Sequence, residues 1–293
     1  MLPPFELLMP QTLPEALDML GGYAPDALPV AGGTNLIPDM RGGKRTPGVV
    51  VNVAGLEELE GIRREDGYLV IGSGVTIAEL LESSLIDEHA PVLRQAAEVF
   101  ANPLVRNRAT VGGNLGNASP AADAAPPLLV LDAEVKLVSA GESRWVPLED
   151  FFVGVCDTIC RHVELMAAIR TPVPAPGSFG RFRKLALRKS TAISVVSVAV
   201  QMTFNHAGRC EDVAIALGAV APTPIRAYDA EAVLRGEALT PQVIEEATRS
   251  ACDAARCIGD VRSSAGYRER VTGVLVRRLL EEVGAERGVE SRE

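Results

Sequence analysis

The sequence predicts an α+β protein made of more than one domain, and three observations support this. The chain has 293 residues, more than a single hydrophobic core usually supports. Strand-like and helix-like runs are mixed along it, without the repeated βαβ alternation of a doubly wound sheet. A stiff segment over residues 172–177 contains three prolines and a glycine. This segment predicts a domain boundary.

Capping signals predict where several helices begin. Thr12 and Glu15 have the spacing of a capping box, in which the hydroxyl caps the first turn and the carboxylate returns the bond. Thr76 and Glu79 repeat this pattern, and a further helix is expected over residues 92–100.

Short apolar runs between glycine, proline or polar residues predict the strands. They cover residues 28–31, 49–53, 68–71, 135–138, 164–169, 181–187, 193–204 and 213–217. Ser119 followed by Pro120 predicts a helix start, with Asp123 one turn inside that helix. Two helices, over residues 241–256 and 264–283, are expected to end the chain.

Composition excludes several classes of function. The net charge is −9 and no long basic run is present, so nucleic acid and acidic membrane surfaces are not expected as partners. No apolar stretch has the length of a transmembrane helix, and the N-terminus lacks the pattern of a secretory signal. We therefore expect a cytoplasmic protein.

The cysteines and histidines do not form a catalytic or metal-binding pattern. The five cysteines are an odd number at irregular spacings, and the three histidines, His89, His162 and His206, are scattered. We expect reduced thiols, no metal site and no catalytic triad. The chemistry is then expected to come from a cofactor that the protein binds and orients.

Two Gly-Gly segments, over residues 31–36 and 110–115, are the candidate binding elements. Glycine lets the backbone approach a ligand closely and turn its N–H groups outward, and a row of such donors can bind an anion. Two facing rows could hold both phosphates of a dinucleotide, with hydrogen bonds from the neighbouring Thr and Asn side chains. The alternative is that both segments are tight turns that serve only the chain's topology.

A Rossmann-type site near residue 72 is a weaker candidate. Gly72 and Gly74 follow a predicted strand and precede a helix, but Ile77 occupies the position of the third glycine. We therefore interpret this segment as a turn followed by a capped helix.

Two charged residues could support a ligand. Asp123 could accept hydrogen bonds from ribityl or ribose hydroxyls, or it could simply be an acid favoured in a first helical turn. Strand alternation places Phe182, Lys184 and Ala186 on one face. Lys184 could neutralise a phosphate or a reduced flavin, or it could be a solvated lysine at a sheet edge.

The two Gly-Gly segments and their surroundings resemble those of a known family. Residues 31–36 and 109–129 resemble the FAD-binding (medium) subunits of molybdenum hydroxylases such as carbon monoxide dehydrogenase and xanthine dehydrogenase. The similarity runs nearly end to end and includes residues 144–152, 182–184 and 260–268. The residues after Thr110 are its most specific part.

The resemblance implies a two-part FAD-binding domain of the PCMH or vanillyl-alcohol-oxidase type, followed by a smaller α+β C-terminal domain. The expected division is residues 1–56 and 57–174 for the two FAD-binding subdomains and 177–293 for the C-terminal domain. FAD would be bound non-covalently. By this resemblance, the cofactor-binding residues are Val30, Ala31, Gly32, Gly33, Thr34, Asn35, Leu36, Thr110, Gly112, Gly113, Asn114, Asp123, Met166 and Lys184.

The resemblance also implies partners. These are a small subunit with two [2Fe–2S] clusters and a large subunit with a molybdopterin cofactor, assembled as a dimer of heterotrimers. Five cysteines could not ligate two such clusters at four ligands each, so the clusters would lie on another chain.

The expected function is electron transfer through FAD to a final acceptor such as NAD or a quinone. A free-standing FAD-dependent oxidase or reductase with its own substrate site is the alternative enzyme. A non-enzymatic interaction module with incidental glycine turns is a third possibility.

Overall fold

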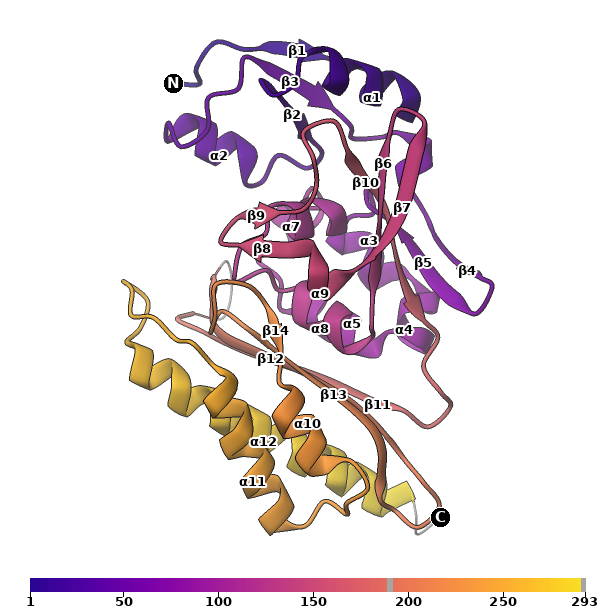
Figure 1. Ribbon diagram of the computed structural model, residues 1–293, viewed down its shortest axis with the longest axis vertical. Helices are drawn as coiled ribbons and strands as arrows, with labels where there is room; N and C mark the ends of the chain where they lie inside the picture. Colours follow the sequence, from indigo (N-terminus) through magenta and orange to yellow (C-terminus); the bar gives the residue numbers. More distant parts are fainter. Residues whose placement is uncertain (189–191, 291–293) are drawn as a thin grey trace.

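The computed structural model describes residues 1–188 and 192–290 of the chain. Three larger sheets follow one another along the long axis of the molecule, in sequence order, and each has its own helices (Figure 1). The mixture of strands and helices confirms the predicted α+β class. None of the described helices is long and apolar enough to cross a membrane.

The first sheet is parallel, with strand order β1-β3-β2. Its strands are Glu6–Leu8 (β1), Ala27–Val30 (β2) and Val49–Asn52 (β3), and its helices are Leu13–Gly22 (α1) and Leu36–Arg41 (α2). Thr12 caps α1 as predicted, because its side chain accepts from the Glu15 N–H. The returning bond differs from the prediction, since the Glu15 carboxylate accepts from the Gln11 N–H at 2.7 Å.

The second sheet is antiparallel, with strand order β4-β5-β10-β6-β7. Its strands are Ile62–Glu65 (β4), Tyr68–Gly72 (β5), Glu134–Ser139 (β6), Glu142–Pro147 (β7) and Leu165–Pro172 (β10). A two-stranded ribbon, Phe152–Gly154 (β8) and Asp157–Thr158 (β9), lies beside it.

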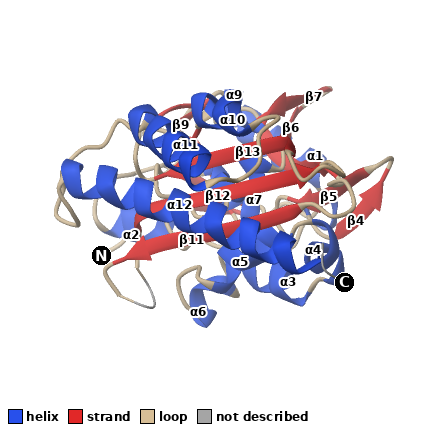
Figure 2. Ribbon diagram, turned by 90° about the horizontal axis from the view of Figure 1, so that it is seen from below, coloured by secondary structure: helices blue, strands red, loops and turns tan. Residues whose placement is uncertain are grey.

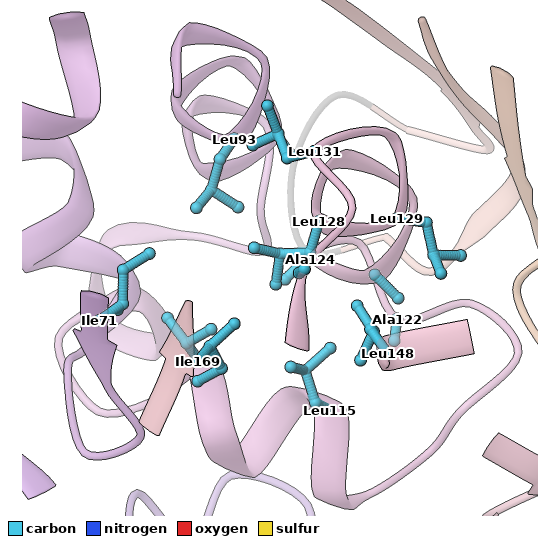
Figure 3. Packing of buried hydrophobic residues seen from close by; sticks show 14 of the residues in the cluster. Ile71, Leu93, Leu115, Ala122, Ala124, Leu128, Leu129, Leu131, Leu148 and Ile169 are labelled. Carbon is cyan, nitrogen blue, oxygen red and sulfur yellow. The ribbon is translucent and has the colours of Figure 1, made fainter. Parts of the chain in front are cut away.

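Short helices pack against this second sheet. They are the 3-10 helix Glu57–Leu59 and the α-helices Ile77–Glu82 (α3), Ser84–His89 (α4), Pro91–Glu98 (α5), Pro103–Arg106 (α6), Val111–Gly116 (α7), Ala125–Val130 (α8) and Leu148–Phe151 (α9). Figure 3 shows their core, in which Ile71 and Ile169 of the sheet lie near Leu115 of α7 and Leu128 of α8. Thr76 and Glu79 form the complete capping box predicted for α3.

The C-terminal part is a four-stranded antiparallel sheet with helices on its outer face. The strands are Phe179–Ala186 (β11), Ser194–Phe204 (β12), Cys210–Gly218 (β13) and Ile225–Arg226 (β14), in that order across the sheet. The helices are Tyr228–Leu234 (α10), Pro241–Ala254 (α11) and Ala265–Glu290 (α12). In Figure 2, α11 and α12 lie across the strands.

Side-chain alternation divides this last sheet between two cores. Val198, Val200 and Ile215 point to the outer face, where they pack with α11 and α12. Phe182 and Ala199 point the other way, into the same buried cluster as residues of α5 and α8. The inner face of the C-terminal sheet is therefore part of the core of the preceding domain.

The predicted helix start at Ser119 is wrong. The helix in this region, α8, begins at Ala125, and the Ser119 hydroxyl only accepts from the Ala121 N–H at 3.3 Å. Pro126 and Pro127 explain the difference. They lack the N–H groups that a longer helix would need, so they fit only near a helix start. Asp123 therefore precedes the helix and does not lie inside it.

Candidate flavin-binding site

The first Gly-Gly segment follows β2 and leads into α2. Gly33 has φ of +69°, a conformation that residues with a Cβ rarely adopt. The backbone N–H groups of residues 32–35 donate to no other described residue, although Gly33 and Asn35 accept through their carbonyls. This segment therefore presents a run of unused backbone donors.

The second Gly-Gly segment begins α7 and is tied to the loop after β5. Gly112 N donates to Ser73 O at 2.9 Å and Asn114 N to Thr110 O at 2.9 Å. Gly113 N donates to the Thr110 hydroxyl at 3.0 Å, which caps the helix. A Cβ on Gly112 would lie 2.5 Å from Ser73 Cβ, so this glycine permits a close backbone contact.

The two segments meet directly. A Cβ on Gly32 would lie 1.8 Å from the carbonyl oxygen of Arg108, two residues before Thr110. Only glycine leaves room for this contact, because the obstructing atom belongs to the backbone. The fold thus places side by side two segments that are more than seventy residues apart in the sequence.

One cavity of about 590 Å³ is lined by both segments. All the predicted cofactor-binding residues line it except Lys184: residues 30–36, Thr110, Gly112, Gly113, Asn114, Asp123 and Met166. Binding cavities for cofactors typically have volumes in this range.

Lys184 is paired with Asp123. Its Nζ donates to Asp123 Oδ2 at 2.6 Å and to Ala192 O at 3.3 Å, and the Ser194 hydroxyl donates to Asp123 Oδ1 at 2.5 Å. The Lys184 side chain is only 7% exposed, so the alternative of a solvated edge lysine is wrong. Burial raises the pKa of Asp123, while the charge of Lys184 and the two hydrogen bonds oppose that shift.

A charged cluster forms another part of the cavity wall. The Glu164 carboxylate accepts from Arg144, and from Arg161 at 2.9 Å. Burial raises the pKa of Glu164, but the bonds from Arg161 and Arg144 outweigh burial and hold it below its usual value. Burial, and then the nearby Glu164 charge, raise the pKa of Cys160 to about 11, so this thiol is protonated at neutral pH.

Sequence reasoning missed several lining residues. Ser73 and Gly74 belong to the segment considered as a Rossmann turn, and both line the cavity. Ser73 also supports the second Gly-Gly segment, because its carbonyl accepts from Gly112 N. Ala101 also lines the cavity and has φ of +37°, a backbone conformation that an alanine in the sequence does not predict.

Arg45 contributes a cation that makes no hydrogen bond or ion pair with another described residue. Arg106 is bonded within the protein, since it donates to the carbonyls of Glu98 and Phe100.

Comparison with known proteins assigns the two parts of the chain. Residues 3–174 match the family described as the FAD binding domain in molybdopterin dehydrogenase. Residues 181–283 match the CO dehydrogenase flavoprotein C-terminal domain.

Relatives and solved structures match over almost the whole chain. The carbon monoxide dehydrogenase medium chain of Hydrogenophaga pseudoflava is 32% identical over 281 residues, covering 96% of this chain and 97% of the relative. The xanthine dehydrogenase FAD-binding subunit of Escherichia coli O157:H7 is 31% identical over 279 residues, covering 94% of this chain and 95% of the relative.

The solved structure of the Hydrogenophaga pseudoflava carbon monoxide dehydrogenase that lacks the Mo-pyranopterin moiety of the molybdenum cofactor gives a TM-score of 0.94. It is 32% identical in sequence, and the match covers 97% of this chain and 99% of that one. The chain therefore belongs to the FAD-binding flavoprotein subunits of molybdenum hydroxylases, a family of oxidoreductase subunits that includes carbon monoxide and xanthine dehydrogenases.

Proposed function

We propose that the cavity between the two Gly-Gly segments holds one FAD non-covalently and that the chain passes electrons within a molybdenum hydroxylase. The observation that carries the proposal is the shared lining. One cavity of about 590 Å³ contains both segments, Asp123 and Met166. Residues from distant parts of the sequence thus converge on a space suited to a dinucleotide.

The first Gly-Gly segment supplies the diphosphate contacts. Its free N–H groups at residues 32–35 are the type of donor that binds an anion without a charged side chain. Arg45 adds a positive charge to the same cavity. The side chains of Thr34 and Asn35 lie in this stretch and can add short hydrogen bonds.

The second segment and the sheet shape the cavity. Gly112 keeps α7 close to Ser73. Asn114 Oδ1 accepts from the Ala124 N–H at 3.2 Å, which holds the loop that carries Asp123. Met166 adds an apolar surface from β10, suited to a flat ring. Lys184 contributes to the site through Asp123, because its Nζ donates to the Asp123 carboxylate.

Bound FAD would supply the redox chemistry, and these residues would bind and orient it. We propose that electrons arrive from [2Fe–2S] clusters of a small subunit after oxidation at a molybdopterin cofactor of a large subunit. They would leave to a final acceptor such as NAD or a quinone. Among the described residues, no group of three or more His, Cys, Asp and Glu side chains could hold a metal ion.

We further propose a dimer of heterotrimers in the cytoplasm. The names of relatives support a multi-subunit enzyme, because they include a medium chain and an FAD-binding subunit. The five cysteines are all free thiols, as expected in a reducing compartment. We propose functional divisions at residues 1–56, 57–174 and 177–293, which correspond to the first sheet, the second sheet and the C-terminal sheet.

The visible absorption spectrum of the purified chain, before and after heat denaturation, tests FAD binding. Flavin bands that move to the supernatant on denaturation would support a non-covalent cofactor. A colourless chain that fails to take up added FAD would overturn the proposal.

Copurification distinguishes the subunit from the free-standing oxidase or reductase. The subunit should copurify with an iron–sulfur chain and a molybdopterin chain, and alone it should show only weak activity with artificial dyes or NADH. Efficient turnover of a substrate by the isolated flavoprotein would favour the free-standing enzyme.

A further inference from the structure

A buried ion pair links the two domains at the wall of the cavity. Asp123 lies in the loop before α8, whereas Lys184 and Ser194 belong to β11 and β12 of the C-terminal sheet. The side chains of Lys184 and Asp123 are 7% and 9% exposed, and Ser194 is fully buried. Removing one partner of a buried ion pair is costly because the other charge is left without compensation.

Lys184 is bonded to two residues that line the cavity, Asp123 and Ala192. Asp123 lines the cavity, but Lys184 does not. Lys184 binds one carboxylate oxygen and Ser194 the other. An ionised carboxylate has about four lone-pair sites, so Asp123 keeps acceptor capacity for a ligand in the cavity.

We propose that Lys184 is a positioning residue that acts on the flavin only through Asp123, by keeping this carboxylate ionised and fixed in one orientation. The proposal rests on FAD occupying the cavity. The ionised carboxylate accepts a hydrogen bond from an N–H or hydroxyl of the flavin half of FAD. Without Lys184, the buried acid takes up a proton and offers a donor in place of that acceptor.

The C-terminal domain also fixes the Ser194 side of this arrangement. Arg262 donates to Ser194 O at 3.1 Å, and the buried Arg268 donates to Val195 O at 3.1 Å. Asp260 accepts from both arginines, at 2.6 Å from Arg262 and 2.7 Å from Arg268. These bonds fix the backbone at the start of β12. Ser194 is therefore kept beside Asp123.

Arg226 provides a matched control. It is a second cation between the same two domains, 10% exposed at its side chain, and it donates to Leu129 O at 3.1 Å and to Asp132 at 2.7 Å. Arg226 does not line the cavity. Its substitution disturbs the domain contact without touching Asp123.

The experiment is a double-mutant cycle on the full chain, with Lys184→Met, Asp123→Asn and the double variant. The readouts are the Kd for FAD, measured from flavin fluorescence, and the two-electron midpoint potential of the bound flavin. We expect Lys184→Met to weaken FAD binding about tenfold, the usual scale for one charge-assisted hydrogen bond, and to shift the potential. In the Asp123→Asn background the same substitution should change neither quantity.

Two further variants distinguish an effect of Lys184 on the Asp123 carboxylate from a general effect on the contact between the domains. Lys184→Arg retains the charge and should recover part of the wild-type affinity. Arg226→Met should lower the unfolding temperature while leaving the flavin potential at its wild-type value. An equal effect of Lys184→Met with and without Asp123 would overturn the proposal, as would an equal shift of the potential in Arg226→Met.

If Lys184→Met does not fold, Ser194→Ala tests the same arrangement. It removes only the second hydrogen bond to Asp123, so it should weaken FAD binding by less, and only while Asp123 is present. An additive effect of Ser194→Ala in the Asp123→Asn background would overturn the proposal. Failure of the wild-type chain to bind FAD would instead overturn the proposed function.

Discussion

The two Gly-Gly segments are similar in sequence but differ in what their backbones do. In residues 32–35, the N–H groups donate to no other described residue. In the second segment, Gly112, Gly113 and Asn114 all donate within the protein, to Ser73 O, the Thr110 hydroxyl and Thr110 O. The first is equipped to bind an anion, whereas the second is equipped to hold a helix close to a neighbouring loop.

The difference shows that a Gly-Gly pair can have more than one structural role. Glycine can free a donor by allowing an unusual φ, or it can allow two backbones to touch. Gly33 is an example of the first use and Gly112 of the second. We therefore expect substitutions in the two segments to fail in different ways.

The largest effect is expected where the segments touch. In Gly32→Ala, the added methyl would meet the Arg108 carbonyl at 1.8 Å. Such overpacking costs about 1–3 kcal/mol of stability and should weaken FAD binding about 100-fold, because the segment must move. The flavin-to-protein ratio and the unfolding temperature measure both effects. Gly21→Ala, in open space on α1, is the control; wild-type FAD content in Gly32→Ala would refute the contact.

A bulky residue at Gly116 should act on the ligand alone. Gly116 lines the cavity, and a Cβ there meets nothing within 4 Å. Gly116→Leu should weaken FAD binding about tenfold or more by occupying ligand space, with little change in unfolding temperature. Isothermal titration with FAD gives the affinity, and Gly21→Leu controls for a leucine in a helix. Undiminished affinity would place FAD away from this end of α7.

Amide hydrogen exchange compares the two segments in one sample. Without FAD, the N–H groups of Gly112 and Gly113 should exchange slowly and those of residues 32–35 quickly. On adding FAD, exchange at residues 32–35 should slow by about tenfold, because the ligand becomes their acceptor. Equal protection of both segments before FAD is added would show that residues 32–35 have no free N–H donors.

The smallest effect is expected at Arg45. Arg45→Gln should raise the Kd for FAD about three- to tenfold at low salt and by less at high salt, since a partly exposed charge is screened. The nearby Arg41→Gln, which alters an exposed arginine outside the cavity, should have no effect. A loss of affinity that does not depend on salt would argue against an ionic role.

Much of the fold followed from local patterns. The complete capping box at Thr76 and the strand alternation around Phe182 were both predicted correctly, because short-range hydrogen bonds and burial determine them. The short helices α4, α6 and α9 were not predicted. Each has only four to six residues, so tertiary packing decides whether it forms.

The site was less predictable than the fold, because it depends on contacts between residues that are distant in the sequence. The motifs identified residues 31–36 and 110–115, but no local pattern shows that Lys184 reaches Asp123 across a domain contact 61 residues away in sequence. The same limit applies to the Ser119 helix start, where Pro126 decided the outcome from further along the chain.

The contact between α5 and β11 has a consequence for how the protein is made. The Gln95 amide spans the open edge of β11, donating to Gly180 O at 3.2 Å and accepting from Phe182 N at 2.8 Å. Because α5 and α8 precede the last sheet in the chain, they leave the ribosome before β11 does. A fragment that starts at residue 177 would expose this edge and the apolar face beneath it, so sedimentation should detect aggregates of the fragment. In the full chain the first domain thus covers this edge of β11, which the fragment would leave open to other chains.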